Sequence, residues 1–278
     1  MLRIVVLTLF TMLAFSGNSL LCRAALLQTD IDAASFTSIR LVSGALMLWL
    51  LVSLRANSKH NEGSWLSAAT LFIYAATLSF AYAGLPAGLG AILLFGAVQV
   101  TMISWGIKTG ECFSVKQWLG LVLAFAGLIG LMLPGVSAPP LISSLLMIGS
   151  GVAWGLYSLR GKGTGNPIAV TAGNFARAVP FSLILSVLFF KHMSLDPLGV
   201  AYAITSGAVT SGLGYTIWYT VVPTLRASSA ATIQLCSPVL TSIAGVVFLQ
   251  EELTLRLLLS SVVILGGIAL VIYSRQPR

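Results

Sequence analysis

The sequence contains few charged residues. They make up 8% of its 278 residues, whereas a soluble protein carries roughly a quarter. Hydrophobic residues make up 57%, and the mean hydropathy is +0.98. Apolar runs of about 20 residues recur along the whole length, and each is long enough to cross a bilayer. The composition leaves no room for a separate soluble domain and predicts an all-α polytopic membrane protein.

Histidine and cysteine are also scarce, which argues against a metal centre and against enzymatic chemistry. The histidines, His60 and His192, fall in predicted loops, and the cysteines, Cys22, Cys112 and Cys236, form no CxxC or Cys/His cluster. An intramembrane enzyme needs paired aspartates, a histidine-rich metal motif or a Ser/His pair. Because no predicted span contains a histidine or a carboxylate, we expect no metal, no cofactor and no catalytic residues.

Charged residues and Pro/Gly breaks divide the apolar sequence into ten candidate membrane spans. A polar break, PGVSAPP at 134–140, separates two groups of five near the midpoint of the chain. We therefore expect two domains, residues 1–134 and 141–278. The spans are predicted at 4–22, 33–54, 64–83, 87–107, 117–134, 141–159, 167–190, 197–221, 227–249 and 255–274.

Basic residues lie mostly in short loops beside the spans, where they fix the topology. With the N-terminus inside, 10 of the 15 basic residues fall at cytoplasmic ends, 3 at outer ends and 2 within spans. The positive-inside rule therefore predicts that both termini are cytoplasmic. The net charge of +8 does not indicate a nucleic-acid partner, because there is no basic face with exposed aromatic residues.

The two halves of the chain resemble each other. A shift of 140 positions aligns Leu85–Leu133 with Leu225–Tyr273 without a gap; each copy has a small-residue helix, a turn with a glutamate and a Gly-containing helix. In the front parts, Phe15 aligns with Trp154, and Arg40 with Arg177 if two residues of loop length are allowed. An odd number of spans in each half predicts an inverted repeat, which is typical of secondary transporters. Identical pairs include Leu85/Leu225, Ala91/Ala231, Thr101/Thr241, Glu111/Glu251 and Gly127/Gly267.

Three segments are similar to a known family. They are AWGLYSL in the sixth span, ASSAATIQLCSPVLTSIAGVVFLQEELTLRLLLSSVVILGGIALVIY at the end, and AGLGAILLFGAVQVTMISWGIKTGECFSVKQWLGLVLAFAGLIGLML in the first half. Over nearly its whole length the chain resembles the paired EamA domains of the drug/metabolite transporter superfamily. The first half departs from the family pattern, since Val98 stands in place of a proline, and Phe15 and Ser16 in place of Trp-Gly.

The resemblance implies a ten-helix carrier made of two inverted five-helix repeats in a bacterial inner membrane. Many such carriers export amino acids, aromatic ones included, or other small metabolites. We expect alternating access around a central cavity, with a small-molecule substrate and the lipid bilayer as partners. A single chain is enough to enclose the pathway, so a monomer suffices. Two alternatives stay open: an antiporter or flippase for phosphorylated or lipid-linked metabolites, and a non-transporting scaffold or receptor.

The spans lack acidic residues in the middle of the membrane. Glu111 and Glu251 fall in turns, where each is expected to accept hydrogen bonds at the N-terminus of the following helix. A carboxylate proton relay through the membrane is therefore not visible. Facilitated export down a gradient fits the sequence better than tightly proton-coupled transport.

Arg177 lies inside an apolar segment, where a cation is costly. Asn174 shares its helix face, and Pro180 frees one helix carbonyl as an acceptor. The arginine either holds helices together or faces the cavity and attracts a substrate carboxylate, and both interpretations stay open. Arg40, in the equivalent half, lies nearer a predicted membrane end, where it can snorkel, and it is interpreted as a structural intramembrane charge.

Polar and aromatic residues deep in the spans are candidates for the lining of a substrate cavity. Aromatic walls suit zwitterions and apolar side chains. Because Trp and Tyr also gather at membrane interfaces, an interfacial belt is the competing interpretation of Trp154 and Tyr157. The predicted substrate-binding residues are Asn18, Gln99, Trp154, Tyr157, Asn174, Arg177, Tyr215, Trp218 and Gln234.

Proline and glycine residues at two places predict hinge or gate elements. Pro238 lacks an N–H and so permits a kink in the ninth span. Pro86 and Gly88 predict a second bendable point, at the turn that begins the fourth span. Close packing of helices through small residues is the alternative interpretation.

Overall fold

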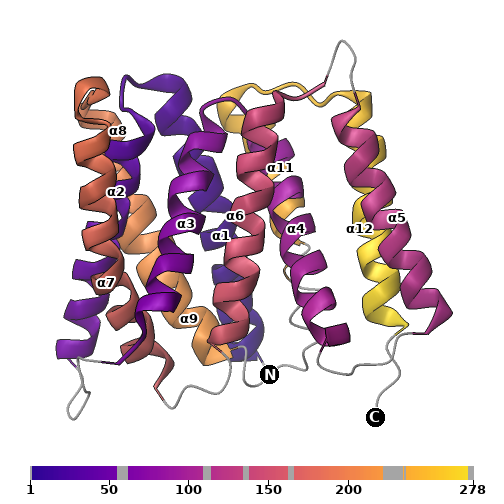
Figure 1. Cartoon of the computed structure of the whole chain (residues 1–278), viewed down its shortest axis with the longest axis horizontal. Helices are drawn as coiled ribbons and strands as arrows, with labels where there is room; N and C mark the ends of the chain where they lie inside the picture. Colours follow the sequence, from indigo (N-terminus) through magenta and orange to yellow (C-terminus); the bar gives the residue numbers. More distant parts are fainter. Residues whose placement is uncertain are drawn as a thin grey trace.

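The computed structural model describes residues 2–54, 62–108, 114–133, 138–161, 166–221, 234 and 236–274. Within these ranges the chain is helical and contains no strand (Figure 1). The helices are α1 (Leu2–Gln28), α2 (Ala33–Ser53), α3 (Trp65–Tyr82), α4 (Ala87–Lys108), α5 (Val115–Met132), α6 (Leu141–Arg160), α7 (Pro167–Leu188), the short 3₁₀ helix η1 (Phe190–His192), α8 (Pro197–Thr205), the π-helical η2 (Ser206–Leu213), α9 (Gly214–Val221), α11 (Cys236–Leu249) and α12 (Leu255–Tyr273).

Side-chain caps explain where several helices begin. The Asp32 carboxylate accepts hydrogen bonds from the first backbone N–H groups of α2, and Ser114 and Gln117 form a capping box at the start of α5. Pro167 and Pro197 occupy the first turns of α7 and α8, where a missing N–H costs no helix hydrogen bond. Residues next to these boundaries therefore determine where the helices begin, without contacts from distant parts of the chain.

The helices are suited to a lipid environment. Six of them, α1, α2, α3, α4, α6 and α7, are long and apolar enough to cross a membrane, and α5, α11 and α12 contain shorter apolar stretches. Large hydrophobic side chains such as Leu9, Phe10 and Val187 are exposed on the outside of the bundle. In a membrane these side chains face lipid. The predicted all-helical, polytopic membrane protein is confirmed.

The predicted spans fall on the described helices. The eighth span corresponds to α8, η2 and α9, which follow one another without a break. The ninth span is represented by α11 and by Gln234, while the rest of its first part lies outside the described residues.

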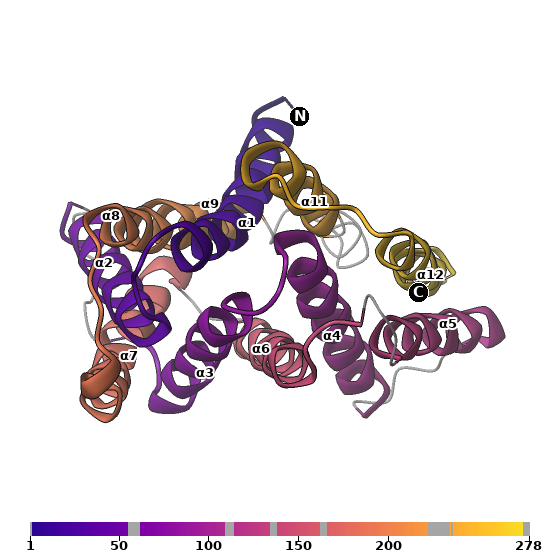
Figure 2. The same ribbon diagram turned by 90° about the horizontal axis from the view of Figure 1, so that it is seen from above.

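Helices from the two halves of the sequence interleave. In the described bundle α3 packs against α6, α2 against α7, α4 against α11 and α5 against α12. The pair α5–α12 lies at one edge of the bundle, as the view from above shows (Figure 2). Helix α1 begins and α12 ends at the same end of the bundle (Figure 1). The centre of the molecule is therefore built by residues from both halves.

Candidate functional site

A central cavity lies among α1, α3, α4, α6 and α9. The room left between its side chains is about 10 Å³, enough for about one water molecule. Since α6 and α9 come from the second half and the other three helices from the first, the cavity is placed where the two halves meet. Its lining residues are Phe15, Asn18, Ser19, Tyr74, Leu94, Phe95, Trp154 and Tyr215.

Trp154 is at the middle of an aromatic cluster. The centroid of its ring system lies 4.8 Å from that of Tyr74, 4.9 Å from Tyr215, 5.7 Å from Tyr157 and 6.0 Å from Phe15. These separations are typical of attractive aromatic pairs. Trp154 and Tyr157 are 6% and 2% exposed, so the interpretation as an interfacial belt is wrong for both. The cluster forms one wall of the central cavity.

Tyr74 also joins this wall to a buried polar network. Its hydroxyl accepts hydrogen bonds from Asn18 Nδ2 and from Arg40 Nη2, each at 3.2 Å. Asn18 Oδ1 in turn accepts from the hydroxyls of Ser206 at 2.8 Å and Thr210 at 3.4 Å. Both hydroxyls belong to η2, and π-helical segments occur frequently at functional sites. The network connects α1, α2, α3 and η2 around the cavity.

Arg40 lies directly behind Tyr74 and is 2% exposed. Its guanidinium carbon is 5.2 Å from the centre of the Tyr74 ring. Its Nε and Nη1 have no hydrogen-bond partner among the described residues. The expected snorkelling is therefore wrong. The physical reason is that α2 is packed closely on η2, where Gly207 lies against the Arg40 carbonyl and leaves the side chain inside the bundle.

Arg177 is placed differently. Its Nη1 donates to the backbone carbonyls of Glu62 at 2.8 Å and Gly173 at 3.0 Å. The neighbouring Asn174 accepts from the backbone N–H of Ser64 at 2.9 Å. Both side chains thus attach α7 to the segment that precedes α3, and Arg177 lines neither the central cavity nor the second cavity described next. These contacts favour the structural interpretation of Arg177.

A second small cavity, with about 10 Å³ of free volume, lies towards the end of the bundle where α3 begins and α6 ends. Asn174 Nδ2 donates to the Tyr157 hydroxyl at 3.4 Å, and Arg160 Nε donates to Ser67 Oγ at 3.0 Å. Tyr157 lines this cavity and contacts Trp154, which lines the central cavity, so this tilted aromatic pair lies between the two. The lining residues are Ser67, Tyr157, Arg160, Gly161, Val170, Thr171, Asn174 and Tyr219.

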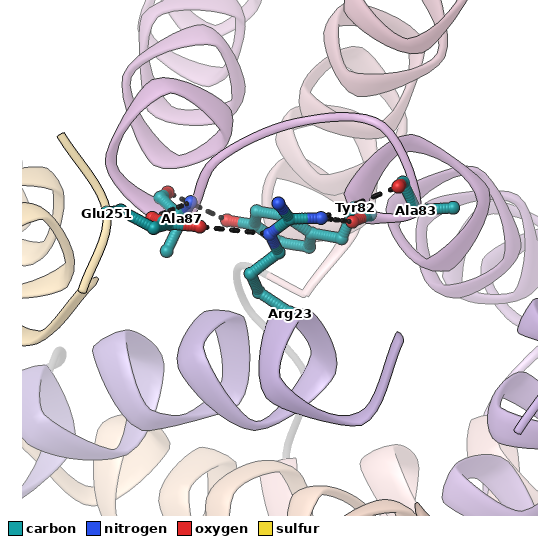
Figure 3. Close-up of polar contacts among 5 residues, drawn as sticks. All are labelled: Arg23, Tyr82, Ala83, Ala87 and Glu251. Atoms are coloured by element: carbon teal, nitrogen blue, oxygen red, sulfur yellow. Dashed lines mark hydrogen bonds and ion pairs between the residues drawn. The ribbon is translucent and has the colours of Figure 1, made fainter. Parts of the chain in front are cut away.

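An ion pair between the two halves lies at the end of the bundle opposite the second cavity. Figure 3 shows its contacts. Arg23 Nε, near the end of α1, is 2.9 Å from Glu251 Oε1 in the turn before α12. Arg23 Nη1 also donates to the Tyr82 carbonyl at 2.9 Å, and Glu251 Oε2 accepts from the Ala87 N–H at 2.7 Å. The cluster therefore holds together α1, the α3–α4 turn and the α11–α12 turn.

The structure corrects the expected partner of Glu251. This carboxylate binds the N-terminus of α4, whereas the start of α12 is capped by Thr254 Oγ1, which accepts from the Leu257 N–H at 3.2 Å. Gln250, just before the glutamate, has a φ of 54°, a left-handed conformation that turns the chain sharply at this point. Glu111, the corresponding residue of the first half, lies outside the described residues.

The other predicted substrate-binding residues are buried, but the two cavities do not include them. Trp218 packs edge-on against Phe15 at 5.8 Å between centroids. Gln99 in α4 is 3% exposed, and its Nε2 has no partner in the described part of the chain. Gln234 is also buried. Across the described residues, no group of three or more His, Cys, Asp and Glu side chains could hold a metal ion.

The predicted hinge residues gather where α4 meets α11. Pro86 immediately precedes α4. Gly88, in the first turn of α4, lies against Ser242 of α11, so a larger residue there would collide with it. The Ser242 hydroxyl donates to the Pro238 carbonyl at 2.8 Å. Close packing through a small residue is therefore present at this contact, and the hinge stays a prediction.

Sequence reasoning missed several lining residues, above all Phe15 and Tyr74. Phe15 did carry a signal, since it aligns with Trp154 in the internal repeat, and the two rings are in contact. Tyr74 is a hydroxyl-bearing aromatic residue near the middle of the third predicted span. Its position alone could have marked it as a candidate.

Comparison with known proteins gives consistent results. The EamA-like transporter family matches residues 141–273. An uncharacterised protein of Pseudomonas aeruginosa is 52% identical over 99% of this chain and 96% of its own length, and the uncharacterised transporter YvbV of Bacillus subtilis is 30% identical over 97% and 91%. The threonine/homoserine exporter RhtA of Escherichia coli is 32% identical over 50% of this chain and 48% of its own. A solved crystal structure shares the fold, with a TM-score of 0.67 over 97% of each chain at 13% identity. The chain therefore belongs to the EamA-like transporter family.

Proposed function

We propose that the protein is a secondary transporter that exports small metabolites, with amino acids as the leading substrates, by alternating access around the central cavity. The observation that carries this proposal is the cavity itself, which has an aromatic wall, a few polar groups and helices from both halves. The similarity to a threonine/homoserine exporter over half of the chain supports amino acids as the substrate class.

The proposed architecture is ten membrane spans in two inverted repeats, residues 1–134 and 141–278. The packing supports it: α3 packs against α6, and the segment that the repeat relates to α3, namely α8, η2 and α9, packs against α1. Helix α1 begins and α12 ends at one end of the bundle, which the distribution of basic residues places in the cytoplasm (Figure 1). The relatives are bacterial, which supports the inner membrane as the location. One chain encloses the whole pathway.

We assign the predicted residues to three parts of that pathway. Asn18, Trp154 and Tyr215 contact the substrate in the central cavity. Tyr157 and Asn174 line the second cavity, through which substrate enters from the cytoplasmic end. The contact of α4 with α11, which contains Pro86, Gly88 and Pro238, acts as a hinge.

We propose that transport is facilitative. Each of the acidic residues that the structure describes lies in a turn, a loop or a helix cap, and none lies inside a helix. A carboxylate is the usual carrier of a coupling proton within the membrane. Flux driven by the substrate gradient needs no such group.

Reconstitution tests the proposal. Liposomes that contain the purified protein are loaded with radiolabelled amino acids, and efflux is followed with and without a pH gradient. We expect efflux of at least one amino acid without a gradient. Trp154→Ala should abolish it, whereas Trp118→Ala, which removes a half-exposed tryptophan of α5, should not. Absence of flux for every amino acid would contradict the substrate class and favour the phosphorylated or lipid-linked alternative.

A further inference from the structure

We propose that Arg40 binds the carboxylate of the transported molecule. The inference rests on the proposed transport function and names the chemical group that the central cavity recognises. Sequence reasoning gave this role to Arg177 as one of two interpretations. In the structure Arg40 lies directly behind the cavity, hydrogen-bonded to the lining residue Tyr74, whereas Arg177 is bonded to the segment before α3.

The first argument is the missing counter-charge. Arg40 is 2% exposed, and two of its three nitrogens have no hydrogen-bond partner among the described residues. The ion pair that the described residues do form is between Arg23 and Glu251 at the end of the bundle. A buried charge without a counter-ion is strongly unfavourable, and the single hydrogen bond and ring contact with Tyr74 replace only part of the lost hydration. An anion that arrives with the substrate would supply the missing partner.

The second argument is an excess of donors around one point. The Tyr74 hydroxyl already accepts from Arg40 and Asn18, so its own proton is left for another acceptor. The Tyr215 hydroxyl, on the same cavity, is buried and has no partner in the described part of the chain. A carboxylate accepts several hydrogen bonds and donates none. A carboxylate bound here would accept from Tyr74 and Tyr215 and, once the Tyr74 side chain moves aside, from Arg40.

The charge favours a carboxylate over a phosphate. A phosphate monoester carries about −1.5 to −2 at neutral pH and generally requires more than one cation. The lining of the central cavity contains no charged residue, and Arg40 behind it supplies a single positive charge. The aromatic wall around Trp154 provides apolar contact for a side chain and π faces for an ammonium group. This combination fits an amino acid.

Thermal unfolding of the purified protein tests the inference. The ligands are the amino acids, acetate, succinate and inorganic phosphate, and, for each amino acid that stabilises, its amide. We expect at least one carboxylate to raise the melting temperature by about 2–5 °C when it is well above its Kd, and the matching amide to have no effect. Arg40→Gln should lose the shift, whereas Arg177→Gln should keep it. If Arg40→Gln does not fold, Arg40→Lys should show a weakened shift.

The possible outcomes separate the two proposals. If carboxylates stabilise through Arg40 but no amino acid leaves the liposomes, the transport of amino acids is wrong and the role of Arg40 stands. If amino acids are exported and Arg40→Gln keeps the full shift, the role of Arg40 is wrong and the transport function stands. Stabilisation by phosphate alone, or by no carboxylate, overturns the inference.

A second inference comes from the other end of the bundle. We infer that the Arg23–Glu251 pair is the closure that must open to release substrate on that side. Glu251 alone in this cluster belongs to the second half, while Arg23, Tyr82, Ala83 and Ala87 belong to the first (Figure 3). The side chains of Arg23 and Glu251 are 12% and 11% exposed. Any movement that separates the halves here breaks the ion pair and the bond to α4.

Labelling from outside tests this closure. The substitution Ser19→Cys, at a residue that lines the central cavity, is introduced into a chain with its three native cysteines replaced by serine. A membrane-impermeant thiol reagent is then applied on the side where residues 250–254 lie. We expect labelling about tenfold faster with Glu251→Gln than with Glu252→Gln, which changes an exposed neighbour. Equal rates overturn the inference. Hydrogen exchange of the backbone amides of residues 83–90, compared between the same two variants, measures this opening with the native cysteines in place.

Discussion

Arg40 in α2 and Arg177 in α7 align when the two halves of the sequence are superposed, and their helices pack against each other. Arg177 is half-buried and donates to two backbone carbonyls, those of Glu62 and Gly173. Arg40 is fully buried and makes one hydrogen bond, to the Tyr74 hydroxyl. The two aligned arginines therefore have different surroundings. Two backbone carbonyls replace lost water around Arg177, whereas Arg40 has only the Tyr74 hydroxyl among the described residues.

The difference between Arg40 and Arg177 illustrates two uses of a cation inside a membrane protein. Carbonyl dipoles can replace water around a guanidinium, and the arginine then fastens one segment to another, as Arg177 does. Where a single hydroxyl is the acceptor, as at Arg40, the protein keeps an unfavourable charge, and such charges are characteristic of ligand sites. The predictions below test this contrast from the largest expected effect to the smallest.

The largest effect should appear in a matched pair of methionine substitutions. Arg177→Met should lower the free energy of unfolding by about 2–4 kcal/mol, since two carbonyls lose a charged donor. Arg40→Met should leave it within about 0.5 kcal/mol or raise it, because the variant removes a charge that has no counter-ion. Denaturant unfolding in detergent, followed by circular dichroism, measures both. Equal losses in the two variants would show that Arg40 is structural as well.

A pair of tyrosine substitutions sharpens the contrast within the pathway. Tyr74→Phe removes the hydroxyl that Arg40 and Asn18 share and should lower efflux about tenfold, equivalent to about 1.4 kcal/mol. Tyr157→Phe removes a hydroxyl bound by Asn174 at the longer distance of 3.4 Å and should change efflux less than about twofold. Efflux from liposomes checks both. A larger loss in Tyr157→Phe would place the critical polar group in the second cavity.

The attachment of α7 can be tested without substituting either arginine. In Gly173→Ala the new Cβ would collide with the Glu62 carbonyl, which accepts from Arg177, so stability should fall by about 1–3 kcal/mol. Gly149→Ala, in α6, meets no atom within 4 Å and should be neutral or slightly stabilising. Thermal unfolding distinguishes them. Similar effects would mean that the close approach at Gly173 contributes little.

The smallest effect concerns the turn that positions α2, and hence Arg40. Burial raises the pKa of the Asp32 carboxyl, but hydrogen bonds from Ser35, Ser194 and Ala34 outweigh it, so the pKa lies below its ordinary value. A lowered folded-state pKa gives stability that is present above the unfolded pKa of about 3.9 and is lost as pH falls through the folded value. The stability difference between wild type and Asp32→Asn should therefore be constant above about pH 5 and shrink below about pH 4. A difference that is unchanged at low pH would contradict this.

The fold was largely predictable because it depends on local composition. Apolar length and Pro/Gly breaks predicted helices that the structure describes, often to within a few residues, as for α6 and α7. Trp154, Asn18 and Tyr215 were predicted as cavity residues because polar and aromatic groups are conspicuous in apolar spans. These inferences need only the sequence around each residue.

The positions of the arginines and of Glu251 could not be predicted in the same way. The side chain of a helical residue points towards the N-terminus of its helix, which brings Arg177 towards Glu62 in a loop that no local pattern connects with α7. Arg40 is retained inside because α2 lies close to η2, and Glu251 meets Arg23 across 228 positions of sequence. Each of these contacts depends on how distant helices are packed.

Efflux of an exported amino acid from liposomes containing wild type, Arg40→Gln or Arg177→Gln, at equal amounts of folded protein, tests the central claim most directly. If Arg40 is the substrate anchor, Arg40→Gln should lower the rate at least about tenfold and Arg177→Gln less than about twofold. Loss of efflux in Arg177→Gln, with a normal rate in Arg40→Gln, would contradict the account and return the substrate contact to α7.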